Sequence, residues 1–171
     1  DVMSEFEIPE LMLASSSEVY QQPSVVPTPE TIPMIVPELD NPRYSYGLGK
    51  IVQEFYGFHA MKNLKRFVIF RPHNIYGPRM GNLHVVPQLI EKCKNAKRHG
   101  GSLEIEGDGL QTRSFCFIDD FVDAFELILN QGEHQSVYNI GTSEEVSIRD
   151  LVDLIAKLMD FSGDIKTSVG P

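Results

Sequence analysis

Short apolar runs and longer stretches of helical periodicity alternate along the chain. Residues 10–14 and 66–71 are mainly apolar and are followed by polar or turn-forming residues, which predicts two buried strands. Further short strands are expected at residues 103–106, 114–118 and 137–140. Strands that alternate with helices in this way imply an α/β architecture with parallel strands.

Four helices are expected around these strands. Apolar residues recur at three- and four-residue steps over residues 46–61, with Ile51, Phe55, Phe58, Val52 and Tyr56 on the apolar side, and a second helix is expected over residues 84–97. Asp119 or Asp120 can cap a third helix, whose apolar face would contain Phe121, Val122, Ala124, Phe125, Ile128 and Leu129. Ser147 and Asp150 resemble a capping box that opens a helix burying Ile148, Leu151, Val152, Ile155 and Leu158.

Two loops interrupt this alternation. Residues 23–42 contain six prolines, and since proline can neither donate to a ladder nor continue a helix, this segment is expected to be an irregular surface loop. Long loops without regular structure are usually functional covers or linkers. Residues 71–82, rich in proline and glycine, are expected to form a second loop.

Charge and composition exclude several classes of protein. The formal net charge of −9 argues against a nucleic-acid partner, because phosphates bind to a basic face. The chain has no apolar run long enough to span a membrane and no signal peptide at its start, which favours a cytoplasmic protein. Cys93 and Cys116 lack metal-binding spacing, so we expect two reduced thiols and no metal site.

Tyr46 and Lys50 are the first candidates for chemistry. They lie four residues apart at the start of a predicted helix, so their side chains project from one face. An ammonium held near a phenol favours the phenolate, which suits proton transfer. Taken alone, the two residues fit an ordinary surface pair, with Tyr46 half buried, better than a catalytic pair.

A series of motifs in one order gives this pair its context. Ala14 to Tyr20 (ASSSEVY) follows the first strand, and the proline-rich loop comes next. YGLGK at residues 46–50, RPHNIYGP at 71–78, GDGLQTRSF at 107–115 and IDD at 118–120 then follow. This order resembles the extended short-chain dehydrogenase/reductase family, specifically its NAD-dependent nucleotide-sugar epimerases, dehydratases and decarboxylases. The resemblance runs from Leu11 to about Leu158.

The resemblance implies roles for three residues in sugar oxidation. Tyr46 matches the family's catalytic base, and Lys50 matches the lysine that favours its ionised form and holds the nicotinamide ribose. Ser16 matches the residue that hydrogen-bonds the sugar 4-hydroxyl. The family uses these groups with NAD to form a 4-keto-sugar intermediate. For Ser16, simple turn chemistry after a strand is the alternative.

Glu18 bears on the type of reaction. In the family's dehydratases and decarboxylases a glutamate here is positioned to take a proton from C5, which the neighbouring keto group acidifies. Some epimerases of the family also carry this glutamate. Epimerase, 4,6-dehydratase and decarboxylase therefore stay open, as does a solvated loop glutamate.

The resemblance also implies a ligand-binding set. Pro72 and His73 match the segment that passes the nicotinamide, and Asn74 matches an asparagine on the nucleotide phosphate. Arg113 matches the arginine on the diphosphate, where a planar guanidinium can bind two oxygens. Arg79 is expected to assist it, and Val85 to line the nucleobase and sugar pocket. The implied partner is a nucleoside-diphosphate sugar.

The fold implied is partial. The family begins with a G-x-x-G-x-x-G turn that receives the NAD pyrophosphate, and this sequence contains none. We therefore expect the second half of a doubly wound Rossmann-like sheet over residues 1–75. A smaller substrate-binding part is expected over residues 76–171, from which residues 114–140 return to the sheet.

Three hypotheses about the whole chain follow. An incomplete epimerase or dehydratase, truncated at its N-terminus and at its C-terminus, would bind NAD weakly and be inactive alone. A non-catalytic sugar-nucleotide-binding module is the alternative from another class. The family's homodimer would be altered or domain-swapped, because the helix from Tyr46 forms part of its interface.

Overall fold

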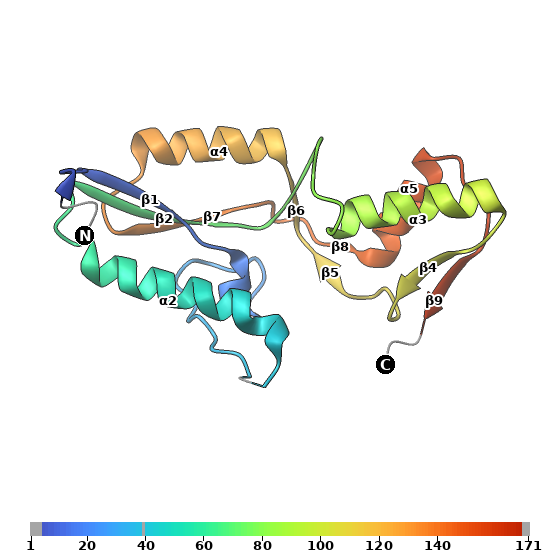
Figure 1. The fold of residues 1–171 in the computed structure, drawn as a ribbon, viewed down its shortest axis with the longest axis horizontal. Coiled ribbons are helices and arrows are strands. Elements are labelled where there is room, and N and C mark those ends of the chain that lie inside the picture. Colours follow the sequence, from blue (N-terminus) through green and yellow to red (C-terminus); the bar gives the residue numbers. More distant parts are fainter. Residues whose placement is uncertain (1–4, 39, 169–171) are drawn as a thin grey trace. The chain divides into compact units, whose positions relative to one another are not determined.

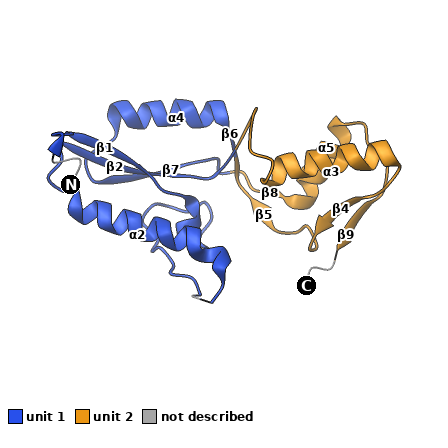
Figure 2. Cartoon of the chain, in the orientation of Figure 1, with its two compact units in different colours: residues 1–75, 116–143 blue, residues 76–115, 144–171 orange. Residues whose placement is uncertain are grey.

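The structure is a computed structural model that describes residues 5–38 and 40–168. The chain folds into two compact units (Figure 2). Unit 1 contains residues 1–75 and 116–143, and unit 2 contains residues 76–115 and 144–171. Each unit is therefore built from two separate stretches of the chain.

The sheet of unit 1 has three parallel strands in the order β1-β2-β7. These are β1 (Glu10–Ala14), β2 (Arg66–Pro72) and β7 (Ser136–Ile140). In register, Ala14 lies beside Phe70, and Phe70 lies beside Tyr138. Because the strands are parallel, the segments that follow β1, β2 and β7 leave the same edge of the sheet.

Two helices cover the faces of this sheet, with α4 (Ile118–Gln131) on one side and α2 (Ser45–Ala60) on the other (Figure 1). Side chains of a strand alternate between faces, and those of β2 are almost fully buried. Phe67 packs against α2, where its ring meets Phe58 and Gly57. Phe70 packs against Phe125 of α4 with ring centroids 5.0 Å apart.

Unit 2 consists of two helices and short strands. Its helices are α3 (Val85–His99) and α5 (Ile148–Leu158). Strand β4 (Leu103–Glu106) pairs in parallel with β9 (Ile165–Ser168), and β5 (Thr112–Arg113) pairs antiparallel with β8 (Val146–Ser147). The core is apolar and contains Leu89, Cys93, Leu103, Ile105, Ile148, Leu151, Val152 and Ile155.

The remaining short elements lie in connecting segments. The 3-10 helices are η1 (Ser17–Tyr20) and η2 (Pro42–Tyr44). Strand β3 (Asn74–Tyr76) pairs with β6 (Phe115–Phe117), and the boundary between the units passes through both strands. The expected loop over residues 71–82 therefore contains a strand, a feature that its proline and glycine content obscured.

The α/β fold class with parallel strands is confirmed. The Ser147 cap is also confirmed, since its hydroxyl accepts a hydrogen bond from the Asp150 N–H at 3.0 Å. The Asp119 or Asp120 cap is wrong: α4 begins at Ile118, and its N-cap Phe117 makes no side-chain hydrogen bond. Both aspartates lie in the first turn, where negative charge is favourable near the helix N-terminus.

Three predicted apolar faces need correction. On α2 the apolar side is directed outward, with Phe55 and Tyr56 each 67% exposed and Val52 exposed as well, whereas Gly47, Glu54 and Gly57 are buried. On α5, Leu158 is exposed, and on α4, Val122 and Leu129 are exposed. Periodicity therefore predicted these helices correctly, but some of the residues that it assigned to their buried faces are exposed.

Candidate active site

Lys50 joins the start of α2 to the end of β1. Its ammonium donates a hydrogen bond to the Ala14 carbonyl at 2.9 Å. The same ammonium lies 5.6 Å from the centre of the Tyr46 ring, so the two side chains share a face, as their spacing predicted. Tyr46 is 53% exposed, which leaves its phenol open to a ligand.

Ser16 and Glu18 lie in the turn that directly follows β1. The Ser16 hydroxyl accepts a hydrogen bond from the Glu18 N–H at 3.2 Å and so caps η1. Gly47 of α2 comes close to this turn, because a Cβ there would lie 2.8 Å from Nε2 of Gln21 and 3.3 Å from the Glu18 carbonyl. Absence of a side chain at Gly47 thus lets the start of α2 approach the serine turn.

Pro72 and His73 stand at the end of β2. The His73 N–H donates to the Ile140 carbonyl at 2.8 Å, and a Cβ on Gly141 would lie 2.5 Å from the imidazole. Burial lowers the pKa of His73 below its ordinary value, although the Glu30 carboxylate acts in the opposite direction. The imidazole is therefore neutral at pH 7.

The residues predicted to bind the nucleotide sugar are divided between the units. Asn74 begins β3 in unit 1, whereas Arg79, Val85 and Arg113 belong to unit 2. Arg113 is exposed, and its guanidinium donates to the carbonyl of its neighbour Thr112 at 2.7 Å. Arg79 is exposed with a φ of 66°, and Val85 packs against the core of unit 2.

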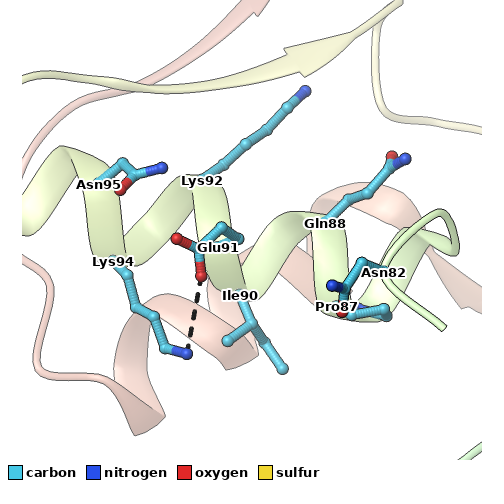
Figure 3. Close-up of a pocket in the computed structure, with 8 residues that line it drawn as sticks. All are labelled: Asn82, Pro87, Gln88, Ile90, Glu91, Lys92, Lys94 and Asn95. Carbon is cyan, nitrogen blue, oxygen red and sulfur yellow. Dashed lines mark ion pairs between the residues drawn. The ribbon is translucent and has the colours of Figure 1, made fainter. Parts of the chain in front are cut away.

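A hollow of about 400 Å³ lies along α3 (Figure 3). Its walls include Asn82, Gln88 and the ion pair between Glu91 and Lys94, whose nitrogen and oxygen are 3.7 Å apart. None of the predicted site residues lines it. The hollow therefore gives no support to the predicted nucleotide pocket.

The sequence did not point to a buried polar network beside the predicted site. Glu54 and Arg71 form an ion pair, and Tyr20, Asn139 and Ser15 continue it by hydrogen bonds. Glu54 follows Lys50 by one helical turn, and Arg71 ends the buried part of β2. Arg71, a charged residue directly after the apolar run of residues 67–70, was the one available signal.

Other kinds of site receive no support from the described residues. Among residues 5–38 and 40–168, no group of three or more His, Cys, Asp or Glu side chains could hold a metal ion. No helix in that part of the chain is long and apolar enough to cross a membrane.

Comparison with known proteins identifies the class. The NAD dependent epimerase/dehydratase family matches residues 1–141, and this chain belongs to that family. A putative UDP-glucose 4-epimerase of Methanocaldococcus jannaschii is 32% identical over 170 residues, which cover 96% of this chain and 52% of the relative. UDP-glucuronic acid decarboxylase 5 of Arabidopsis thaliana is 33% identical over 163 residues, covering 91% and 45% respectively.

A solved structure of another nucleotide-sugar enzyme is also similar to this chain. The UDP-glucuronic acid 4-epimerase of Bacillus cereus, in complex with UDP-glucuronic acid and NAD, superimposes with a TM-score of 0.78 at 27% identity. It covers 94% of this chain, which in turn covers 49% of that structure. The chain thus spans about half the length of these relatives, and it shares the Rossmann-like architecture of an NAD-dependent family.

Proposed function

We propose that this chain supplies the catalytic residues of a nucleotide-sugar epimerase or dehydratase that works through a 4-keto sugar. The hydrogen bond from Lys50 to the Ala14 carbonyl carries this proposal. It ties the helix that bears Tyr46 to the end of β1, two residues before Ser16. In this proposal the base Tyr46, the cation Lys50 and the hydroxyl of Ser16 act together at this corner of unit 1.

The residues of this corner suit oxidation of a secondary alcohol. The Tyr46 oxygen takes the proton of the sugar 4-hydroxyl, while the Ser16 hydroxyl hydrogen-bonds the same oxygen and orients it. Lys50 keeps a positive charge beside the phenolate. NAD, when bound, would supply the acceptor for the hydride that leaves C4 as the C4–O bond becomes a carbonyl.

The residues present fit one half of NAD. Tyr46 is exposed and Lys50 partly exposed, and Pro72 ends β2 with His73 directly after it. These four residues would hold the nicotinamide half. A neutral His73 adds no charge that would oppose a cationic nicotinamide. The sequence printed here contains no G-x-x-G-x-x-G turn for the pyrophosphate.

The substrate side of the proposal rests on Asn74, Arg79, Val85 and Arg113. An exposed guanidinium such as that of Arg113 can form two charge-assisted hydrogen bonds with a diphosphate. Such bonds are worth about 1.5–3 kcal/mol each. We therefore propose a nucleoside-diphosphate sugar as the ligand.

Glu18 favours dehydration or decarboxylation as the second candidate. Its side chain is exposed in the turn that also contains Ser16, and the start of α2 adjoins that turn. A carboxylate at this place can take a proton next to the 4-keto group. Glu18→Gln should leave formation of the 4-keto sugar intact and stop only the later proton removal.

Self-association, as an altered or domain-swapped form of the family homodimer, is part of the proposal. The outward side of α2 exposes Val52, Phe55 and Tyr56, and a contiguous apolar surface of this kind is typical of an interaction site. A second copy of the chain is the partner that we propose.

Two variants test the assignment of the pocket by isothermal titration with nucleoside diphosphates. Arg113→Ala should weaken binding about tenfold or more, since a loss of about 1.4 kcal/mol raises the Kd tenfold. Tyr46→Phe should leave it unchanged, because the phenol acts in the chemical step. Equal weakening by both variants would contradict the assignment, and nucleotide binding without any affinity for NAD would favour a non-catalytic binding module.

A further inference from the structure

A buried ion pair lies beneath the proposed site. Glu54 of α2 is 3% exposed and Arg71 of β2 is 4% exposed. Arg71 donates to both oxygens of the carboxylate, from Nε at 2.8 Å and from Nη2 at 2.6 Å. Burial alone would lower the pKa of Arg71, but its hydrogen bonds and Coulombic interactions with Glu54 and Tyr20 outweigh burial and raise that pKa, so the guanidinium stays charged.

The pair extends by hydrogen bonds to the ends of all three strands. Ser15, which directly follows β1, donates a hydrogen bond from its hydroxyl to Oε1 of Glu54. Nη1 of Arg71 donates to the Tyr20 hydroxyl at 2.6 Å, and that hydroxyl donates to Oδ1 of Asn139 in β7 at 2.8 Å. We call these five residues the strand-end network. It connects β1, η1, α2, β2 and β7.

Three members of this network, Ser15, Glu54 and Arg71, adjoin residues of the proposed site. Ser15 precedes Ser16, and its N–H continues the ladder to the Phe70 carbonyl. Glu54 follows Lys50 by one turn on the buried side of α2. Arg71 precedes the Pro72–His73 pair in sequence. The network thus connects the turn that contains Ser16, helix α2 with Tyr46 and Lys50, and the Pro72–His73 segment proposed to contact the nicotinamide.

We propose that Glu54 and Arg71 are positioning residues, which hold the serine turn in fixed register with the helix of Tyr46 and Lys50. This inference rests on the proposed function. Two hydrogen bonds one helical turn apart, from Lys50 to Ala14 and from Ser15 to Glu54, set the place of Ser16 relative to α2. A displacement of about 1 Å at such a site can reduce turnover about 100-fold.

Stability alone does not account for a charged pair here. Replacing a buried ion pair by well-packed apolar residues of similar volume is often neutral or stabilising. An apolar pair, however, offers nothing to the hydroxyls of Ser15 and Tyr20. The hydrogen bonds, which fix direction as well as distance, are what the charged pair adds.

The test is the double variant Glu54→Leu with Arg71→Met in the complete protein, which removes both charges together. We expect a folded protein whose kcat falls about 10- to 100-fold, with KM for the nucleotide sugar unchanged. Ser15→Ala leaves the ion pair in place and should lower kcat in the same way but by less. If the double variant does not fold, Ser15→Ala decides, and a wild-type kcat there would overturn the proposal.

A matched control exists on the same two strands. Glu10 and Arg66 form an ion pair at the opposite ends of β1 and β2, with Nη2 and Oε2 2.5 Å apart. Glu10→Gln with Arg66→Met should leave kcat at its wild-type value. An equal fall in kcat in both double variants would overturn the proposal, because loss of any ion pair would then suffice.

Amide hydrogen exchange tests the network without reference to turnover. In the Glu54→Leu, Arg71→Met variant, exchange at residues 15–21 should accelerate about tenfold or more, as local opening becomes easier there. Exchange at residues 67–70 should change much less. Uniform acceleration, or none at residues 15–21, would overturn the proposal. Absence of NAD-linked turnover in the complete wild-type protein would contradict the proposed function, whereas the exchange comparison would still decide the role of the network.

Discussion

Helices α2 and α5 each pack against the rest of their own unit, yet they bury opposite kinds of residue. Helix α5 buries Ile148, Leu151, Val152 and Ile155. Helix α2 buries Gly47, Glu54 and Gly57 and exposes its large apolar side chains. The glycines allow close approach to η1 and to Phe67, and the glutamate joins a polar network.

This difference separates two tasks that a helix can have. Burial of several aliphatic side chains in α5 contributes to stability in proportion to the apolar area removed from water. The buried side of α2 contributes little such area, but it determines where Lys50, Glu54 and the start of the helix meet the sheet. We infer that α5 maintains its unit and that α2 places chemical groups. The predictions below test this division.

The largest effect is expected at Tyr46. Tyr46→Phe removes one exposed oxygen from α2, so the free energy of unfolding should stay within about 0.5 kcal/mol of wild type. Turnover of the nucleotide sugar should fall about 100- to 10,000-fold, the range for loss of a general base. Thermal unfolding and initial rates, measured on the same preparation of the complete protein, check both expectations. Unchanged turnover would show that α2 carries no base.

Truncation of a side chain in the core of unit 2 should instead lower the free energy of unfolding. Ile155→Ala on α5 should lower the free energy of unfolding by about 2–5 kcal/mol, because it leaves a cavity next to Val152 and Leu151. Leu158→Ala is the matched control, since Leu158 lies on the same helix but is exposed, and it should cost about 0.5 kcal/mol or less. Urea denaturation measures both. Similar losses in the two variants would contradict the burial of α5.

Two glycines of α2 should respond to alanine with opposite sign. A Cβ on Gly57 would lie 2.7 Å from the Phe67 ring, whereas a Cβ on Gly49 has no neighbour within 4 Å. Gly49→Ala should stabilise the protein by about 1 kcal/mol through helix propensity. Gly57→Ala should destabilise it by about 1–3 kcal/mol, because overpacking at Phe67 exceeds that gain. Stabilisation by both changes, seen in denaturant midpoints, would mean that α2 lies farther from the sheet.

The smallest effect on the isolated fold is expected on the outward side of α2. Phe55→Glu should alter the free energy of unfolding of the monomer by about 0.5 kcal/mol or less, because Phe55 is largely exposed. The same change should shift the proposed dimer toward monomer in sedimentation at matched concentrations. Lys62→Glu, an exposed change in charge just beyond α2, serves as the control. A variant that still dimerises would exclude this face as the interface.

The sequence predicts elements well where pattern and packing agree. Strand β2 was expected over residues 66–71 and spans Arg66–Pro72. Its continuous apolar run is stable only where both faces of the strand are buried, between α2 and α4. For α5, both the cap and most of the buried face were expected. Unit 2 also contains β5, β8 and β9, which were not expected, because segments of two to four residues carry too little periodicity.

The candidate site was predictable only through its order of motifs. The spacing of Tyr46 and Lys50 gave their common face, and the residue order gave the family. Burial of Glu54 could not be deduced, because its partner Arg71 is 17 positions away in sequence and only the folded chain brings them together. The apolar residues of α2 misled for the same reason, since periodicity indicates a face but not its direction.

The proline-rich loop has a consequence for conformational entropy. Residues 23–42 contain six prolines, and hydrogen bonds attach the loop at a few points, such as from Asn139 Nδ2 to the Thr28 carbonyl at 2.9 Å and from the Ile35 N–H to the Val19 carbonyl at 3.0 Å. Proline restricts the unfolded chain, so each of these prolines loses less conformational freedom on folding than another residue would. A loop with this composition can be fixed beside a ligand site by few contacts, where a glycine-rich loop of equal length would stay in motion.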